Sequence, residues 1–359
     1  MAQRDRIEER LRGILLGTAV GDALGLPVEG LSRRRARKLF PGPWRHRLFL
    51  GCGMISDDTE HAIFVSQALL VHPDSVAGFG RSLAWKMRFW LLGLPAGIGL
   101  ATLRSILKLW CGASPANSGV ASAGNGPAMR SAIIGACFAA DPGKMNDYVE
   151  ASTRLTHTDP RALTGAKAVA ALAAWSMHRD ATTPPEVEQI TALLQQVGQA
   201  DDREWRTILE KIRSACEERL SVEEFAGRLD LHHGVSGYIY HTVPVAIYAW
   251  LRHYGDFQET LESVLECGGD TDTVGAIAGA LAGAVVGERG IPAEWITGIW
   301  DWPRGLGVLR RLGNSLAQQC NGAGAIGPVR YFWPGVIPRN VFFLGVVLAH
   351  GFRRLAPPY

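Results

Sequence analysis

Glycine recurs at every fourth position near the end of the chain, and this stripe constrains the fold more than any other feature. The stripe lies within the apolar stretch 273–287 and consists of Gly275, Gly279, Gly283 and Gly287. Residues four apart share one face of a helix, so the spacing strips that face and lets a neighbouring backbone approach closely. Each glycine costs a helix about 1 kcal/mol relative to alanine. The stripe therefore predicts a centrally buried, tightly crossed helix, because the stretch is shorter than the roughly 18 residues of a membrane span.

Helical periodicity dominates the rest of the chain. Apolar residues recur three and four positions apart, whereas sustained strand-like alternation and Asn-Gly or Asp-Gly hairpins are missing. The pattern predicts helices over residues 7–20, 59–71, 101–110, 127–138, 162–177, 184–197, 202–218, 243–254, 257–267 and 273–287. We therefore expect an all-α fold, a compact many-helix bundle. Since no low-complexity linker divides the chain, we expect one catalytic domain over residues 1–290, with a C-terminal segment 291–359 packed on it.

Charge and cysteine spacing argue against several classes of protein. The formal net charge is only +3 and the basic runs are short, so the sequence does not predict a nucleic-acid groove. The six cysteines include no CxxC pair, so we expect neither a zinc cage nor a disulfide framework. The N-terminus has no apolar signal core, and the longest apolar stretches, 274–287 and 341–349, fall short of a span. We expect a cytoplasmic protein without a membrane partner and leave its oligomeric state open, a monomer included.

Two clusters of acidic and hydroxyl residues each stand at the start of a predicted helix. They are residues 56–60 (SDDTE) and residues 270–273 (DTDT). Capping explains either cluster alone, because Ser, Thr and Asp are favoured at helix N-termini. Two clusters of adjacent, mutually repelling carboxylates also fit a pair of hard divalent cations, which would remove the repulsion. Every donor in the two clusters is an oxygen atom, which favours Mg²⁺, Mn²⁺ or Ca²⁺ over zinc or copper.

Four motifs in a fixed order make the chain similar to a known family. They are residues 21–29 (GDALGLPVE), 56–59 (SDDT), 124–130 (GNGPAMR) and 268–277 (GGDTDTVGAI). This combination resembles the ADP-ribosylglycohydrolases, which include the dinitrogenase-reductase-activating glycohydrolases and the arginine and serine ADP-ribose hydrolases. The resemblance implies an all-α fold with a binuclear Mg²⁺ or Mn²⁺ site in a central cleft. It also implies an ADP-ribosylated protein, or another ADP-ribose-containing molecule, as the substrate.

The resemblance also implies which residues hold the metal and carry out hydrolysis. The metal ligands that it transfers come from both acidic clusters and are Ser56, Asp57, Asp58, Asp270, Asp272 and Thr273. Glu29 aligns with a glutamate that in some relatives contacts a metal or the reacting centre; the alternative is an exposed turn residue. We expect Glu29, Asp57 or Asp58 to act as general acid or base, and the sequence does not apportion these roles. Asp22 is expected to cap or brace the glycine turn rather than to bind metal.

A glycine-rich loop and two further residues are candidates for contact with the substrate. The candidates are Ser122, Gly124, Asn125, Gly126, His157 and Tyr238. Backbone amides of the loop, ahead of a helix predicted to start at Pro127, can hold phosphate oxygens without a lysine. His157 matches a family position near the ligand. Tyr238 is a candidate either for contact with the adenosine half or for simple packing.

The sequence gives conflicting indications about the bond that is cleaved. Ser122 stands where some arginine-specific relatives carry an acid and some serine-specific relatives carry serine, whereas residues 21–29 are closer to the arginine type. We therefore predict a metal-dependent hydrolase that removes ADP-ribose, with arginine linkages slightly favoured. The alternatives are a catalytically silent ADP-ribose-binding protein, a toxin-immunity protein on the same fold and a helical metallohydrolase for another phosphorylated substrate. The six retained ligand positions argue against the silent protein.

Overall fold

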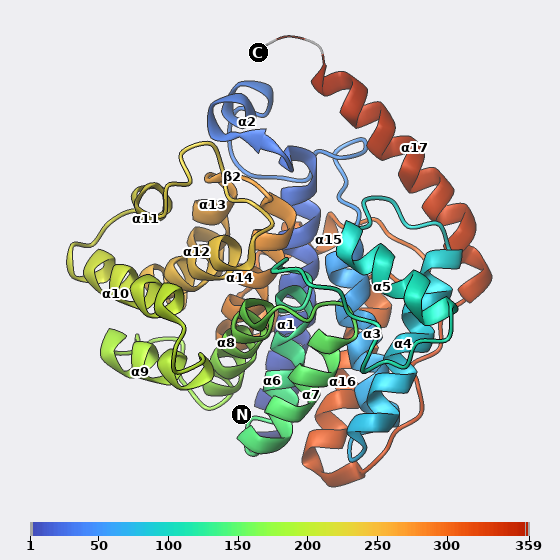
Figure 1. Ribbon diagram of the computed structural model, residues 1–359. Helices are drawn as coiled ribbons and strands as arrows, with labels where there is room; N and C mark the ends of the chain where they lie inside the picture. The colour runs from blue at the N-terminus through green and yellow to red at the C-terminus, as the bar shows by residue number, and fades with distance from the viewer. Residues whose placement is uncertain (1–2, 356, 358–359) are drawn as a thin grey trace.

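Two long helices, α1 (Gln3–Gly25) and α14 (Thr271–Val286), lie side by side at the centre of the molecule (Figure 1). Their glycines face one another, so that a Cβ added to Gly17 would lie 2.1 Å from the carbonyl oxygen of Gly279. Side chains at these positions would force the two backbones apart. All residues of α14 except the last are buried. The prediction of a central, tightly crossed helix is confirmed, and its partner α1 carries glycine at the same spacing.

The computed structural model describes residues 3–355 and 357, and the described part of the chain is almost entirely helical. To the left of the central pair in Figure 1 lie α8 (Pro160–Ser176), α9 (Val187–Val197), α10 (Arg203–Glu217), α11 (Val222–Arg228), α12 (Ile239–Arg252) and α13 (Phe257–Leu265). To its right lie α3 (Asp57–Val71), α4 (Val76–Leu92), α5 (Leu100–Trp110), α16 (Leu306–Gln318) and α17 (Val336–Arg354). The remaining helices are α2 (Arg33–Leu39), α6 (Ala132–Cys137), α7 (Pro142–Arg154) and α15 (Ala293–Thr297). The predicted all-α fold is confirmed.

The predicted helices are present, with two kinds of difference. Several begin earlier than predicted, because the acidic clusters belong to the first turns: α3 begins at Asp57 and α14 at Thr271. The helix predicted over residues 127–138 is divided into a 3₁₀ turn (Ala128–Arg130) and the short α6. The sequence patterns did not predict α2, α4, α7, α11, α15, α16 or α17. Nor did they predict the small antiparallel ladder of β1 (Leu31–Ser32) and β2 (Gly268–Gly269).

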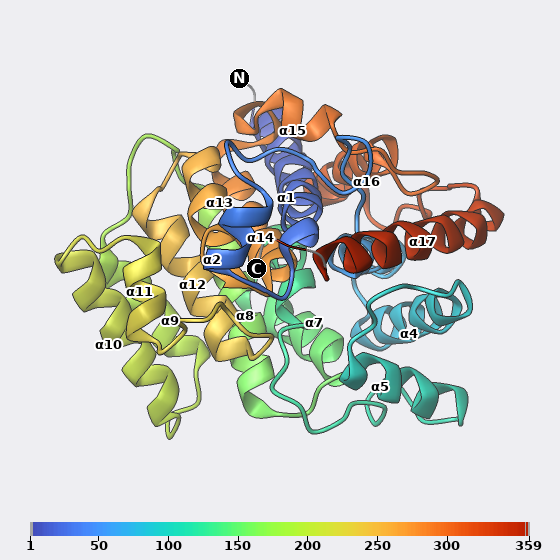
Figure 2. The same ribbon diagram turned by 90° about the horizontal axis from the view of Figure 1, so that it is seen from above.

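The C-terminal residues pack directly against the central helices and the start of α3. Helix α16 contacts both α1 and α3. Helix α17 lies along the outer edge of the molecule, as Figure 2 shows, and buried polar side chains anchor its inner side. Arg339 Nη2 donates to the carbonyl oxygen of Ile55 at 2.6 Å, and His350 Nε2 lies 2.8 Å from the carbonyl oxygen of Pro27. Residues that follow the central pair in the sequence therefore support the loops that lead into the site.

Two helices are long and apolar enough, by length and composition alone, to cross a membrane. The first spans Arg4–Val28, and its most apolar window is 94% buried inside the protein, as expected for a core helix. The second spans Trp333–Arg354, and only 39% of its window is buried. The count of uninterrupted apolar residues missed both segments, because each contains a few charged or polar positions. The sequence-based statement that every apolar segment is too short is therefore wrong for these two helices.

Candidate metal and substrate site

The two acid-rich helix starts meet at one cavity, between the N-termini of α3 and α14. Thr273 Oγ1 donates to Asp58 Oδ2 at 3.3 Å, which joins residues 215 positions apart. The cavity has a volume of about 390 Å³, and its lining includes Asp57 from α3 and Asp272 from α14. A shared site requires these two carboxylates to lie in one cavity. The structure brings them together.

Most of the residues predicted for the site line this cavity. They are Glu29, Ser56, Asp57, Ser122, Gly124, Asn125, Gly126, His157, Asp270, Asp272 and Thr273. Asp58 lies beneath the lining, 1% exposed, in contact with both acidic clusters. Tyr238 lies outside the lining: its hydroxyl donates to Glu204 at 2.8 Å and accepts from Arg161 at 3.2 Å. Its neighbour Gly237 lines the cavity in its place.

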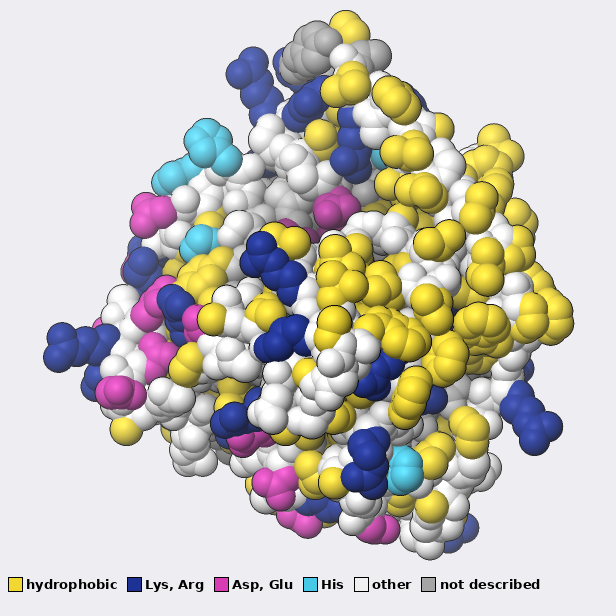
Figure 3. All heavy atoms as spheres, turned by 45° about the vertical axis from the view of Figure 1, so that its right-hand side comes forward, with side chains coloured by type: hydrophobic (Ala, Val, Ile, Leu, Met, Phe, Trp, Pro, Cys, Tyr) yellow, Lys and Arg dark blue, Asp and Glu magenta, His cyan; other side chains and the backbone are white. Residues whose placement is uncertain are grey.

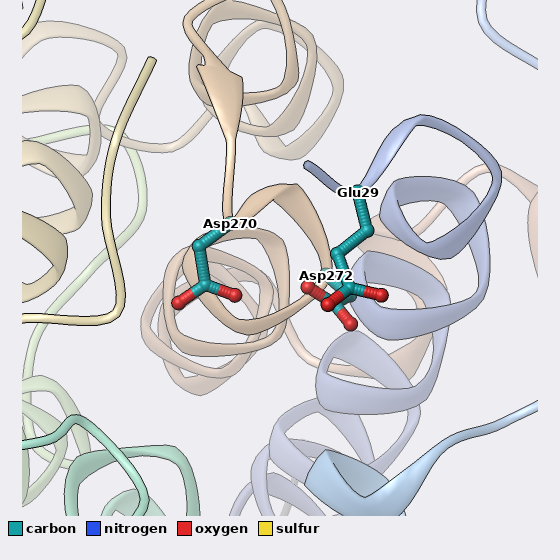
Figure 4. Close-up of side chains that lie close together, drawn as sticks. All are labelled: Glu29, Asp270 and Asp272. Atoms are coloured by element: carbon teal, nitrogen blue, oxygen red, sulfur yellow. The ribbon is translucent and has the colours of Figure 1, made fainter. Parts of the chain in front are cut away.

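Glu29 reaches the acidic residues because the β1–β2 ladder fixes the turn that carries it. Strand β2 ends directly before Asp270, and both of its glycines have left-handed backbones, with φ of 71° and 85°. A Cβ on Gly269 would lie 2.0 Å from the carbonyl oxygen of Val235, so the close approach requires glycine. Carboxylate oxygens of Glu29, Asp270 and Asp272 lie within 4.8 Å of one another (Figure 4). Glu29 stands in an exposed turn, yet its carboxylate points toward Asp272.

Asp22 holds the start of α3 in place. It is fully buried in the last turn of α1 and accepts hydrogen bonds from the amides of Ser56 at 2.8 Å and Thr59 at 3.2 Å. The first amides of a helix have no partner within it, so a carboxylate here satisfies them and orients the helix. Asp22 was predicted to brace a glycine turn. In the structure residues 21–25 continue α1 instead, and Asp22 caps the neighbouring helix.

No ion pair within the described residues neutralises the carboxylates of the site. Two other buried acids beside it are paired with arginines: Arg304 lies 3.0 Å from Glu60, and Arg339 contacts Asp301. In the described part of the chain no arginine or lysine forms a salt bridge with Asp22, Glu29, Asp57, Asp58, Asp270 or Asp272. From beyond salt-bridge distance, the charge of Arg354 acts on Glu29 and Asp272, and that of Arg130 acts on Asp57. Buried charges are normally paired or coordinate a metal. The chain thus pairs the structural acids with arginines at close range and leaves the site acids without a salt bridge, an arrangement that fits a bound divalent cation.

Burial and mutual repulsion raise the pKa values of these carboxylates. Burial raises the pKa of Asp22 to about 6. Burial together with the charges of Glu29 and Asp270 holds the pKa of Asp272 well above its ordinary value. Burial and the charge of Asp57 likewise raise the pKa of Asp58. The Oδ1 atom of Asp58 is buried without a hydrogen-bond partner in the described structure. A divalent cation would offset the repulsion, and the all-oxygen donor set fits Mg²⁺ or Mn²⁺.

The glycine-rich loop around Asn125 was predicted to contact the substrate, and in the structure it also holds a carboxylate of the acidic cluster. Asn125 Nδ2 donates to Asp270 Oδ2 at 2.6 Å and to Thr242 Oγ1 at 3.0 Å. Its backbone amide donates to the carbonyl oxygen of Gly237, and the amide of Gly124 donates to Ser122 Oγ. Two of the amides that were candidates for phosphate contact therefore already have partners within the protein. The side chain of Asn125 orients a carboxylate of the cluster.

A buried polar network behind the loop was not predicted. Arg130 is 1% exposed; it donates to the carbonyl oxygen of Gly126 at 3.1 Å and to Thr156 Oγ1 at 2.7 Å. Thr156 Oγ1 also lies 2.8 Å from Nδ1 of His157, whose ring faces the cavity. Burial and the charge of Arg130 lower the pKa of His157 to about 3, so its ring is neutral at ordinary pH. The only sequence signal for Arg130 was its place at the end of the GNGPAMR motif.

The apolar side of the cavity comes partly from segments without any chemical signal in the sequence. Phe343 and Val347 of α17 line it, together with Leu26 and Met129. The loop between α4 and α5 adds residues 96–97 and 99 to the lining. Apolar helix positions are indistinguishable from core positions until the fold is known. These contributions were therefore missed.

Comparison with known proteins shows similarity over most of the chain, including the residues of the site. Residues 3–325 match the family model for ADP-ribosylglycohydrolase. An uncharacterised protein of Archaeoglobus fulgidus is 33% identical over 303 residues, covering 82% of this chain and 93% of that protein. The ADP-ribosyl-[dinitrogen reductase] glycohydrolase of Rhodospirillum rubrum is 29% identical over 305 residues, covering 81% and 90%. A solved structure described as an ADP-ribosylglycohydrolase-related protein complex superposes with a TM-score of 0.66 at 26% identity, covering 88% of this chain and 99% of that one.

Proposed function

Because the chain belongs to the ADP-ribosylglycohydrolase family, we propose that it releases ADP-ribose from an ADP-ribosylated protein, with arginine slightly favoured over serine as the modified side chain. The observation that carries the proposal is the meeting of two acid-rich helix starts and Glu29 in one cavity, where no salt bridge within the described structure pairs their carboxylates. The family makes the chain a glycohydrolase. The linkage and the metal dependence are the finer part of the proposal.

The residues that would hold two Mg²⁺ or Mn²⁺ ions come from both sides of the cavity. They are Ser56, Asp57 and Asp58 from the start of α3, Asp270, Asp272 and Thr273 from the start of α14, and Glu29. Bound ions would supply Lewis-acid stabilisation and hold the ribose hydroxyls. The unpartnered Oδ1 of Asp58 and the lack of salt bridges to the site carboxylates in the described structure support this assignment.

The chain's own carboxylates can manage the protons of the hydrolysis. Cleavage at the anomeric carbon develops oxocarbenium character, which an acidic cavity stabilises. One carboxylate must take a proton from the attacking water, or give one to the leaving group. Of the three candidates, Glu29 and Asp57 line the cavity, whereas Asp58 lies beneath it and is better placed as a ligand. Burial raises the pKa of Glu29 above its ordinary value, which favours proton exchange nearer neutral pH.

The test incubates arginine-linked and serine-linked ADP-ribosyl peptides with the protein, in the presence of Mg²⁺ or Mn²⁺ and in EDTA. We expect free ADP-ribose from the arginine peptide only with metal. Asp270→Asn should reduce turnover to background with helicity intact, whereas Asp147→Asn, the same change at an exposed position of α7, should not. Turnover in EDTA, or near-normal turnover by Asp270→Asn, would contradict the metal assignment, and release from the serine peptide alone would reverse the linkage. ADP-ribose binding without turnover of either peptide would favour the silent alternative.

A further inference from the structure

The outer side of α17 presents a continuous apolar stripe to solvent. The exposed side chains recur three and four positions apart and are Ile337, Val341, Leu344, Leu348, Phe352 and Leu355, between 40% and 70% exposed. The opposite side of the helix packs on the protein through Phe343 and Val346. A surface helix normally turns its apolar face inward and its polar face outward. On α17 the outer face is apolar as well, and the polar side chains Arg339, Asn340 and His350 are buried on the inner side, so the outer face requires an explanation.

The stripe continues onto the neighbouring helices through exposed aromatic rings. Phe89 of α4 packs edge-on against Trp333, in the 3₁₀ turn directly before α17, with ring centroids 6.2 Å apart. Trp85 stacks on Phe89, and the guanidinium of Arg88 lies 4.7 Å from the Trp85 ring centroid and 6.0 Å from that of Trp110 on α5. Figure 3 shows the hydrophobic side chains gathered over this side of the molecule. Apolar patches of such extent on a soluble surface mark interaction sites.

Positive charge accompanies this apolar surface, and negative charge does not. Residues 75–140 and 302–359, which supply α4, α5 and α17, contain no Asp or Glu. Exposed cations on these segments are Arg81, Arg104, Lys108, Arg311, Arg330 and Arg353. Although the whole chain has a net charge of only +3, this surface is basic as well as apolar. The carboxylates visible in Figure 3 lie away from the yellow right-hand side.

A groove in the same surface has the same character. It lies between α4 and residues 328–336 and has a volume of about 720 Å³. Its walls are aromatic, including Trp85, Phe89 and Trp333, and no Asp or Glu lines it. Arg81 and Arg330 stand in its lining. Aromatic rings beside cations are the composition that membrane interfaces favour.

We propose that this surface docks on an anionic lipid bilayer, with α17 lying in the plane of the interface. Tryptophan, phenylalanine and leucine beside arginine and lysine suit the boundary between acyl chains and anionic headgroups. A second copy of the chain is a poorer occupant, because two such faces would bring their cations together without a carboxylate to pair with them. The proposal replaces the sequence-based expectation that the protein has no membrane partner.

The anchoring of α17 indicates a helix that lies on the bilayer rather than one that crosses it. Asn340 Nδ2 donates to the carbonyl oxygen of Gly93 at 2.7 Å, and Arg339 Nη2 donates to that of Ile55. Withdrawing the helix from the protein to span a membrane would leave these buried polar groups without partners. Docking leaves them undisturbed. It also brings the membrane near the cavity, because Phe343 and Val347 line the cavity from the inner side of α17.

The test is flotation of the full-length protein with vesicles. One set is pure phosphatidylcholine, and the other contains about one-quarter phosphatidylserine. We expect flotation with the anionic vesicles only, weaker at about 500 mM than at about 100 mM NaCl because salt screens the attraction. The double variant Leu344→Glu/Leu348→Glu, which alters exposed side chains outside the cavity, should reduce the bound fraction by about tenfold or more.

The control variant Ala192→Glu/Gln195→Glu adds the same charge on exposed positions of α9, across the molecule from α17, and should float like the wild type. Far-UV circular dichroism checks that both variants keep their helices. Equal loss of binding in both variants, or no flotation of the wild type with anionic vesicles, overturns the proposal. So does a wild-type dimer that Leu344→Glu/Leu348→Glu converts to a monomer in light scattering, since the face would then be a subunit interface. None of these outcomes depends on hydrolysis of an ADP-ribosyl bond.

Discussion

Asn125 illustrates how a single side chain in the glycine-rich loop acts on the site through another residue. Its amide holds Asp270 and is itself held by Thr242. Partners of this kind around a metal ligand are worth about 10–100-fold in affinity or activity. We expect Asn125→Ala to reduce kcat/KM by about that factor and to raise the Mn²⁺ concentration needed for half-maximal rate. A metal titration of steady-state rates measures both.

The matched control for Asn125 is Asn321→Ala. Asn321 Nδ2 donates to the carbonyl oxygen of Ala317, at the end of α16, so the same deletion there removes one bond of the amide without touching the site. We expect kinetics like those of the wild type. A purely structural role for Asn125 would lower the melting temperature and leave the metal dependence of the rate unchanged, which would contradict a positioning role.

His157 should make stability depend on pH. Its folded pKa is lowered to about 3 from an ordinary value of 6.5, so below pH 6.5 the unfolded chain binds a proton that the folded chain does not. The contribution of neutral His157 is therefore complete above pH 6.5 and is lost as the pH falls, at up to about 1.4 kcal/mol per pH unit. Between pH 7 and pH 5 the wild type should lose about 2 kcal/mol more unfolding free energy than His157→Asn.

Urea denaturation in EDTA at the two pH values measures this difference. The comparison uses the change with pH within each protein, so a fixed cost of the His157→Asn substitution cancels. His46 and His350, whose pKa shifts do not involve His157, should titrate alike in both proteins. Equal acid sensitivity of the wild type and His157→Asn would show that the ring is protonated in the folded state, contrary to its burial beside Arg130.

The acidic clusters were predictable at the residue scale, and the groups that orient them were not. Both clusters have the local composition of helix starts, which is visible in a few consecutive residues. The role of Asp22 depends on the approach of α1 to α3, and that of Asn125 on the approach of its loop to α14. No local pattern encodes either approach. Tyr238 was a candidate for substrate contact or for simple packing, and in the structure its hydroxyl donates to Glu204 outside the cavity lining.

At the scale of elements, the glycine contact between α1 and α14 should be intolerant of any side chain. A Cβ on Gly279 would lie 2.2 Å from the carbonyl oxygen of Gly17, and backbone cannot move aside as a flexible side chain can. Gly279→Ala should lower the unfolding free energy by about 3 kcal/mol or more, although alanine is the better helix former. Chemical denaturation measures the loss.

Gly345→Ala on α17 is the control, because an added Cβ there meets nothing within 4 Å. With helix propensity alone at stake, this variant should be about 0.5–1 kcal/mol more stable than the wild type. If the same Gly→Ala change lowers the unfolding free energy at position 279 and raises it at position 345, the difference comes from packing. If Gly279→Ala left the unfolding free energy unchanged, the two central helices would have to move apart easily. The burial of α14 argues against such movement.

The sequence predicted elements best where periodicity and apolar content agreed. The stripe on α14 was read correctly, yet the same spacing in residues 13–25 was not connected with it, because pairing of two faces is a property of the folded chain. Helix α4 was missed: Gly78 and Gly80 interrupt its start, and aromatic rings stand on both its buried and its exposed sides. The β1–β2 ladder was too short for any alternation to be visible.

At the scale of the whole molecule, the cavity combines segments from the beginning, middle and end of the chain. Glu29 follows α1, residues 122–126 precede α6, and α14 lies in the last third of the sequence. The C-terminal helix α17 closes the apolar side. Family-like motifs gave the acidic half of this arrangement. Its apolar half, which sets the shape of the cavity, followed only from the fold.

The concentration of buried negative charge at this junction predicts an unusual response of global stability to one substitution. Asp58 is buried beside other carboxylates, with Oδ1 unpartnered in the described structure, so without metal its charge opposes folding. In EDTA, Asp58→Asn should therefore melt at the same temperature as the wild type or higher.

With Mg²⁺ or Mn²⁺ at about 100 times the dissociation constant, the unfolding free energy of the wild type should rise by about 2.7 kcal/mol. That gain corresponds to a rise of a few degrees in melting temperature, and Asp58→Asn should lose most of it. Differential scanning calorimetry of both proteins, with each ion and with EDTA, measures these melting temperatures. A carboxylate with a purely structural, capping role gives the opposite pattern, because its loss would destabilise the protein in EDTA and leave any effect of the ions unchanged.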